Sequence, residues 1–165
     1  MSSILIGEGI GNEATAGTIG SLYTVGGMVA GVAFDKLHKA MGRFIIPFAV
    51  ACEVIGLLLG YWGTSAAVLM VGSFMTGFAI FTIWPASIME FTEALPPEKI
   101  AAASGIFTAC LGLGGFLTSP YVALITSVTG SDSPRLPILV GAVLTAVVGG
   151  IWSATRVFST KKNDQ

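Results

Sequence analysis

The sequence predicts an all-α membrane protein with five transmembrane helices. Hydrophobic residues make up 53% of its 165 residues and charged residues only 10%, whereas a soluble domain carries roughly 25% charged residues. Its mean hydropathy is +0.84. The charges separate uncharged runs that are long enough to cross about 30 Å of hydrocarbon, which takes about 20 helical residues. Membrane lipid is therefore the expected solvent.

Charges and helix breakers define each element in order. The first uncharged run lies between Glu13 and Asp35, and the second is interrupted only by Glu53. The uncharged run from Val54 to Met89 is too long for one crossing, and the turn-forming segment 60–65 divides it. The predicted spans are residues 14–34, 44–63, 66–89, 100–127 and 136–155.

The remaining boundaries follow from proline-containing connections. Pro96 and Pro97 separate the third span from the fourth, and residues 131–134 separate the fourth from the fifth. Residues 1–13 are predicted to be an outer loop or the end of a preceding helix, residues 14–157 the membrane bundle, and residues 158–165 a cytoplasmic tail.

Basic residues predict the orientation of the chain. If the chain weaves through the membrane, seven basic residues share one side, namely Lys36, Lys39, Arg43, Lys99, Arg156, Lys161 and Lys162. Only Arg135 lies on the other side. Positive charge favours the cytoplasmic side, so we expect a multi-pass plasma (inner) membrane protein with its N-terminus outside and its C-terminus in the cytoplasm.

The composition argues against several function classes. The net charge of −1 offers no basic surface for nucleic acid. The only histidine, His38, lies in a predicted loop, and Cys52 and Cys110 have no metal or catalytic partners at useful spacing. We therefore expect no enzyme activity, no metal site and no cofactor.

Polar residues at membrane depth are the main candidates for function. A carboxylate such as Glu53 at mid-span costs roughly 2.5–3.5 kcal/mol on insertion scales for Asp-type charges. Glu53 is therefore a candidate proton site, and the alternative is a protonated side chain that hydrogen-bonds a neighbouring helix. Pro85 frees a backbone carbonyl in the third span, so Phe81 and Trp84 are candidate cavity-lining residues, with core packing as the alternative.

Small residues recur along three of the spans. They favour close helix packing, and the alternative is that smooth contacts also permit sliding and rocking. They include Gly27 and Gly31 in the first span, Gly112, Gly114 and Gly115 in the fourth, and Gly141 and Gly149 in the fifth.

A loop motif brings one family into view. The segment 31–37, with Gly31, Asp35 and Lys36 at matching positions, resembles the cytoplasmic loop motif of the major facilitator superfamily (MFS). The match departs after Lys36, where either His38 replaces the second glycine or four residues are inserted before Gly42. Such degeneration suits the second copy of the motif.

More of the chain agrees with the same family. Residues 90–105 look like the loop between helices 10 and 11, and residues 113–120 look like a glycine-rich helix 11. The chain therefore resembles helices 8 to 12, a partial C-terminal half of an MFS transporter.

The resemblance implies a function and assigns candidate residues. It implies secondary transport of a small solute by alternating access, as a proton-coupled permease or efflux protein, with the missing N-terminal half as a partner. Helices that would line the cavity carry the substrate candidates Tyr23, Phe81, Trp84 and Thr108, whereas Glu53 would lie on a peripheral helix.

The loop motif implies a device at the cytoplasmic face. Gly31 would allow close helix crossing, and Asp35, Arg43 and Glu90 would form a cytoplasmic latch, with Lys36 completing the motif. The alternatives are that the loop charges set only topology, and that the chain is a small non-transporting membrane protein that binds or regulates a partner.

Overall fold

The computed structural model describes residues 1–131 and 133–160. Side chains are described for residues 1, 4–131 and 133–155. Every regular element in this part of the chain is helical, which confirms the all-α prediction. The elements are α1 (Ser2–Gly7), α2 (Glu13–Met41), the 3-10 helix η1 (Gly42–Phe44), α3 (Ile45–Trp62), α4 (Ala66–Ala94), α5 (Pro97–Thr129) and α6 (Arg135–Thr160). Lys161 and Lys162 of the predicted tail lie outside the described residues.

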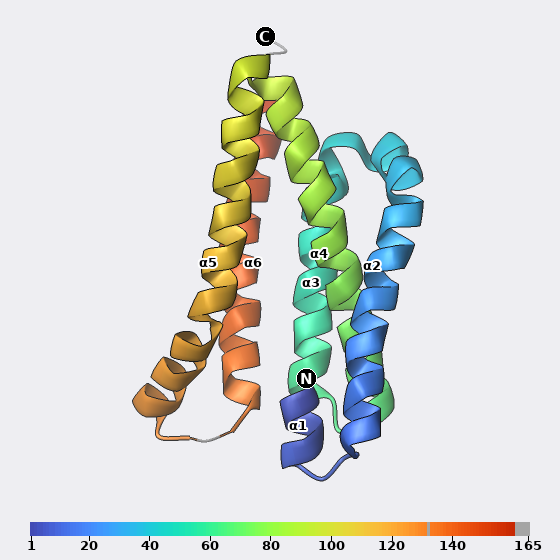
Figure 1. The fold of residues 1–165 in the computed structure, drawn as a ribbon, viewed down its shortest axis with the longest axis vertical. Coiled ribbons are helices and arrows are strands. Elements are labelled where there is room, and N and C mark those ends of the chain that lie inside the picture. Colours follow the sequence, from blue (N-terminus) through green and yellow to red (C-terminus); the bar gives the residue numbers. More distant parts are fainter. Residues whose placement is uncertain (132, 161–165) are drawn as a thin grey trace.

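Five of the helices are long and run roughly along the longest axis of the molecule (Figure 1). The described residues contain four stretches that are long and apolar enough to cross a membrane: Glu13–Trp62, Ala66–Ala94, Pro97–Thr129 and Arg135–Thr155. The first stretch holds both α2 and α3, which fold back on each other at η1. Five separate crossings therefore stay a prediction.

The helices extend beyond the uncharged runs. α2 has 29 residues, or about 44 Å at 1.5 Å per residue, so it is longer than a hydrocarbon core is thick. It continues past Phe34 to Met41 because lysine and alanine are good helix formers. α3 likewise includes Tyr61 and Trp62 and ends at Gly63, whose N–H donates to the carbonyl of Leu59 at 2.8 Å.

Local sequence explains where the helices begin and end. The side chains of Asn12 and Ser65 accept hydrogen bonds from backbone N–H groups at the starts of α2 and α4, as N-cap residues do. α5 begins at Pro97, which lacks an N–H that the first turn would leave unpaired. Gly42 and Gly130, which follow α2 and α5, have φ values of 48° and 62°, a region that glycine enters without strain.

Helix α4 is the centre of the bundle, because it packs against both α2 and α3. Glycine makes this possible: a Cβ atom on Gly77 would lie 1.9 Å from the carbonyl oxygen of Tyr23, and one on Gly26 would lie 2.2 Å from that of Phe74. Small residues let helix backbones approach in this way. α3 in turn packs against α6, where Gly149 lies against Val50.

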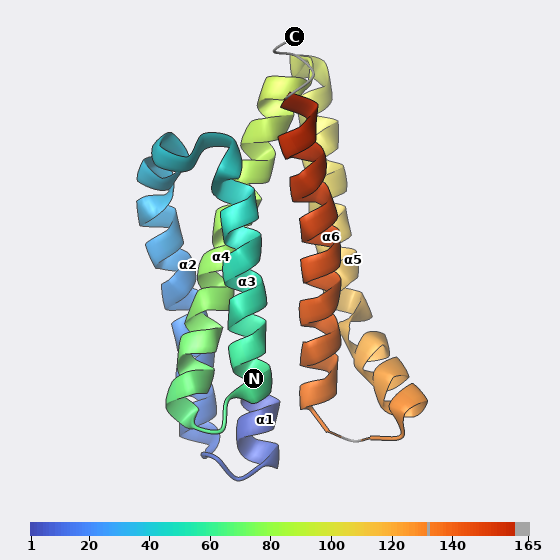
Figure 2. The same cartoon turned by 180° about the vertical axis from the view of Figure 1, so that it is seen from behind.

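Helix α5 stands beside α6 and apart from most of the bundle (Figure 2). Ile125 is the only buried residue among those described in this helix. Helix α5 contacts α4 through the rings of Phe107 and Phe91, whose centroids are 5.6 Å apart. It contacts α6 through Tyr121, which donates a hydrogen bond to the Pro137 carbonyl at 2.7 Å. The packing expected of the glycines in the fourth span is not seen in the described part of the chain, since a Cβ on Gly112, Gly114 or Gly115 would meet nothing within 4 Å.

The bundle has two ends that matter for the site. We call the end with residues 8–12, 63–65, 130–131 and 133–134 the N-terminal end. We call the end with residues 42–44 and 95–96, where α6 also finishes, the C-terminal end (Figure 1).

Candidate functional site

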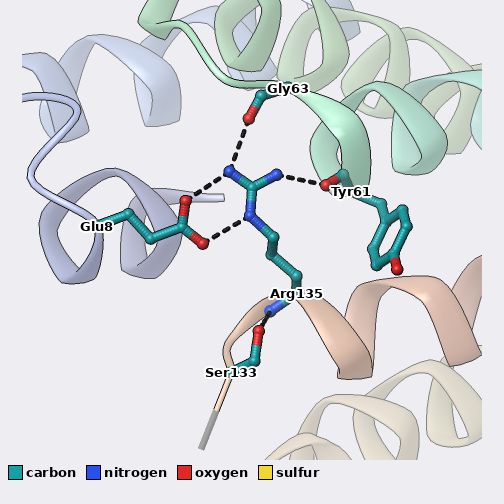
Figure 3. Close-up of polar contacts among 5 residues, drawn as sticks. All are labelled: Glu8, Tyr61, Gly63, Ser133 and Arg135. Atoms are coloured by element: carbon teal, nitrogen blue, oxygen red, sulfur yellow. Dashed lines mark hydrogen bonds and ion pairs between the residues drawn. The ribbon is translucent and has the colours of Figure 1, made fainter.

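A polar cluster joins three connections at the N-terminal end (Figure 3). Arg135 donates to Glu8 from Nε to Oε1 at 2.6 Å and from Nη2 to Oε2 at 2.5 Å. Its Nη2 also donates to the Gly63 carbonyl at 2.8 Å, and its Nη1 donates to the Tyr61 carbonyl. We call this set, the Arg135 guanidinium with the Glu8 carboxylate and the two carbonyls, the Arg135 clamp.

The clamp has a clear physical basis. The Tyr61 carbonyl is among the last four of α3, which have no partner within the helix, and a cation there also meets the negative end of the helix dipole. The forked contact between guanidinium and carboxylate is a strong kind of charge-assisted hydrogen bond. The hydrogen bond from Arg135, helped by its charge and opposed by partial burial, lowers the pKa of Glu8 below its ordinary value.

The clamp is not evident from the sequence, in which Arg135 is only the exception to the charge asymmetry and Glu8 is part of a predicted outer loop. The two residues lie 127 positions apart. The one available signal was that a lone cation and an acidic residue were both expected on the same side of the membrane.

A cavity of about 310 Å³ lies about one helical turn from the clamp along α3 and α6, where Leu57 and Ile138 border it. It is bordered by side chains from α2, α3, α4 and α6 and by the first residue of the chain: Met1, Ile19, Gly20, Tyr23, Leu57, Ser73, Thr76 and Ile138. Ser73 Oγ donates to the Ile19 carbonyl at 2.8 Å, and Thr76 Oγ1 donates to the Gly72 carbonyl at 3.0 Å. Each hydroxyl oxygen keeps lone pairs that can accept from a molecule in the cavity.

Glu53 lies on α3, one helical turn from Leu57 of the cavity lining. It is only 9% exposed, and its Oε2 atom is buried with no hydrogen-bond partner among the described residues. The Tyr23 phenol and the Cys52 thiol lie within its electrostatic reach. An unpaired buried oxygen costs about 1–3 kcal/mol, so this site is costly to the fold as it stands.

The four substrate candidates fall into two groups. The rings of Tyr23 and Phe81 meet edge to face, with 6.0 Å between their centroids. Phe81 and Trp84 are one turn apart on α4 and are 40% and 39% exposed. Thr108 is exposed on α5, where its hydroxyl donates to the Ser104 carbonyl at 2.9 Å.

The loop motif lies toward the C-terminal end. Asp35 pairs with Lys39 one turn along α2, at 3.3 Å, and both side chains are largely exposed. Such pairs contribute little stability. A Cβ atom on Gly31 would meet nothing within 4 Å, so the close crossing expected there is absent from the described residues, while Lys36 is exposed beside Asp35.

The other two latch candidates lie close together. Arg43 and Glu90 border one cavity of about 250 Å³, together with His38, Gly42, Ile45, Ala86 and Glu93. The Arg43 guanidinium also lies over the Phe44 ring, 5.1 Å from its centroid. The structure therefore brings Arg43 and Glu90 to one cavity, whereas the carboxylate of Asp35 binds Lys39.

A larger cavity of about 450 Å³ lies among helices α3, α4, α5 and α6. Its lining comes from α3, α4, α5 and α6 and includes Glu90, Phe107 and Trp152. None of the four substrate candidates borders it. The sequence gives no sign of this cavity, because most of its walls are ordinary apolar residues.

Comparisons with known proteins point to one family. The family model described as Major Facilitator Superfamily matches residues 1–164. Proteins named uncharacterized MFS-type transporters from Burkholderia mallei strain SAVP1 and Burkholderia pseudomallei strain K96243 are each 27% identical over 119 residues, covering 72% of this chain and 29% of their own length. One from Salmonella typhimurium strain LT2 is 27% identical over 107 residues, covering 65% of this chain and 28% of its own length. No solved structure matches.

Proposed function

Because this chain belongs to the Major Facilitator Superfamily, we propose that it forms helices 8 to 12 of a secondary transporter that moves a small solute across the plasma membrane by alternating access. The family match over residues 1–164 carries the proposal. The chain spans less than a third of the length of the curated relatives it matches. The rest of such a transporter, including its N-terminal half, would complete the cavity.

The helices and charges support this assignment within the family. α1 would be the end of helix 7, and α2 to α6 would each cross the membrane. Lys36, Lys39 and Arg43 lie near η1, and Lys99 lies in the first turn of α5 at the same end, whereas Arg135 lies at the opposite end. The positive-inside rule then puts the N-terminal end of the bundle outside and the C-terminal end in the cytoplasm.

The proposed solute surface combines aromatic rings and a hydroxyl. Tyr23 and Phe81 form one wall, Trp84 extends it along α4, and Thr108 would face it from α5. Exposed aromatic faces suit an apolar or cationic solute. At the C-terminal end, Asp35, Arg43 and Glu90 would act as the cytoplasmic latch, with Gly31 and Lys36 in the same loop motif.

Glu53 is the proposed coupling site. It is a buried carboxylate at membrane depth with an unpaired oxygen in the described part of the chain. Taking up and releasing one proton there would link transport to a proton gradient.

The test uses the complete transporter reconstituted in proteoliposomes. A panel of small solutes is screened by thermal shift, and hits are assayed for uptake driven by a pH gradient with a trapped pH-sensitive dye. Glu53→Gln should reduce gradient-driven uptake at least tenfold while leaving solute exchange intact, and the exposed Glu13→Gln is the matched control.

Two outcomes would contradict the proposal. Wild-type proton-driven uptake in Glu53→Gln would remove Glu53 as the coupling site. A specific protein partner without any solute-dependent thermal shift would favour the alternative of a non-transporting membrane protein that binds or regulates a partner.

A further inference from the structure

Three features of the structure lie in a row along α3. The Tyr61 carbonyl accepts a hydrogen bond in the Arg135 clamp, Leu57 borders the 310 Å³ cavity, and Glu53 is buried with an oxygen that has no partner among the described residues. These residues are spaced by four, so they share one face of the helix. Each step is about 6 Å along the helix axis.

The same order holds on the other elements that the clamp connects. On α6, Arg135 forms the clamp and Ile138, one turn further, borders the cavity. Glu8 directly follows α1, and Met1 at the other end of α1 borders the cavity. The clamp therefore ties together the three elements α1, α3 and α6 at the N-terminal end of the cavity.

On α3 the cavity lining comes within about one helical turn of Glu53, because Leu57 borders the cavity and lies four residues away. Tyr23 borders the cavity and lies within electrostatic reach of Glu53. The hydroxyl oxygens of Ser73 and Thr76 also border it and can accept further hydrogen bonds. A space of this size with several polar partners is one that water enters.

We propose that this cavity is the water route by which protons reach Glu53 from the N-terminal end, and that the Arg135 clamp is the gate of that route. The proposal rests on the proposed function, which assigns Glu53 as the proton site and puts this end outside. With the clamp closed, the Arg135 side chain is held between Glu8 and the two carbonyls of the α3 end, where it blocks the entry of water. When the Glu8 contact opens, Arg135 moves aside, and a proton passes from water to a Glu53 oxygen to form the neutral acid.

Few other groups can take that proton. Of the helices around Glu53, α2 contributes the Tyr23 phenol and α3 the Cys52 thiol. Residues 66–89 of α4 and 136–155 of α6 contain no titratable side chain. Every measurement below is repeated with Glu53→Gln, so that a signal from any other group is recognised.

The first experiment measures access to the cavity. Leu57→Cys is introduced into the complete transporter after Cys52→Ser and Cys110→Ser, and a membrane-impermeant cationic methanethiosulfonate is added from outside. We expect Arg135→Gln and Glu8→Gln to raise the labelling rate about tenfold, and Arg135→Lys, which keeps the charge without the fork, to raise it less. Glu13→Gln, an exposed carboxylate at the same end, should leave the rate unchanged.

The second experiment measures access to the carboxyl itself. A water-soluble carbodiimide with glycine ethyl ester modifies carboxyl groups that water reaches, and peptide mass spectrometry identifies them. Glu53 should be modified at least tenfold more in Arg135→Gln than in wild type, and the modified peptide should disappear in Glu53→Gln. If Leu57→Cys distorts the bundle, Ile138→Cys serves as the second reporter.

The outcomes separate this inference from the proposed function. Equal thiol labelling in wild type and both clamp variants would overturn the gate. Labelling of the Leu57→Cys thiol while Glu53 stays unmodified would overturn the route. Neither measurement requires transport. If the labelling shows a gated route but the Glu53→Gln variant keeps proton-driven uptake, only the coupling role of Glu53 is contradicted.

Discussion

At the scale of single residues, Arg135 shows how one side chain can serve several partners. Its planar fork binds a carboxylate on one edge and two backbone carbonyls on the others (Figure 3). A lysine has the charge but lacks the fixed geometry. Substitution of Arg135 therefore removes support from α1, α3 and α6 together.

The stabilisation by the clamp should depend on pH in a defined direction. The pKa of Glu8 is lowered in the folded protein, so the contribution of the ion pair is complete above the ordinary glutamate pKa and is lost as pH falls through the lowered value. The difference in melting temperature between wild type and Glu8→Gln should be constant from pH 7 to about 5 and shrink below about pH 4. A difference that grows on acidification would contradict this assignment.

Trp84 offers the sharpest test of the solute surface. It is 39% exposed on α4, so Trp84→Ala removes contact area without opening a hole in the core. We expect about a tenfold change in apparent solute affinity, or about 1.4 kcal/mol, measured as uptake against solute concentration. Unchanged transport in the alanine variants of Tyr23, Phe81, Trp84 and Thr108 would reject this surface.

At the scale of helices, close packing is concentrated where α4 meets α2 and α3. Gly26, Gly56, Gly72 and Gly77 all lie where an added Cβ would come within 3 Å of a neighbouring helix. The glycines of α5 have no such neighbour among the described residues. The same residue type therefore has different roles in the two places.

The glycine contrast gives a paired prediction. Gly77→Ala should destabilise the protein by about 1–3 kcal/mol or more, because the new Cβ would lie 1.9 Å from the Tyr23 carbonyl oxygen and overpacks the contact. Gly112→Ala should be neutral or stabilising, since alanine is the better helix former and nothing in the described part of the chain lies within 4 Å. Melting temperatures in detergent would show both, and equal shifts would contradict the packing account.

At the scale of the whole molecule, two polar clusters lie at opposite ends of the bundle. The Arg135 clamp joins connections at the N-terminal end, while Arg43 and Glu90 share a cavity at the C-terminal end. α5 and α6 stand side by side as a pair, and α6 is the one that packs on α3 (Figures 1 and 2). In the proposed transporter, these two ends are the places where access to either side of the membrane would be controlled.

The latch proposal predicts a shift of the equilibrium between the outward-open and inward-open states. In the complete transporter, Asp35→Asn should raise the inward-open fraction, read as faster labelling of single cysteines from the cytoplasmic side. Lys39→Gln is the control, because it breaks the pair with Asp35 on α2 but leaves the carboxylate available to the latch. Unchanged accessibility in Asp35→Asn would leave the loop charges with a role in topology alone.

The chemical class of the protein was determined by sequence alone. Apolar runs bounded by charges predict helices in lipid, because the cost of burying charge applies to each segment separately. Asn12, Ser65 and Gly130 mark helix ends through local backbone hydrogen bonds and φ values, which need no distant partner. The place of Glu53 inside a long apolar run was likewise readable from the sequence.

Tertiary structure alone decided which of these residues meet. The pairing of Arg135 with Glu8 joins positions 127 apart, and the crowding of Gly77 against Tyr23 depends on how α2 crosses α4. Asp35 binds Lys39 on its own helix, while Arg43 and Glu90 come to one cavity from different helices. Helix contacts in an apolar bundle are chosen by shape and by a few polar partners rather than by a hydrophobic face, so the periodicity of the chain carries no record of them.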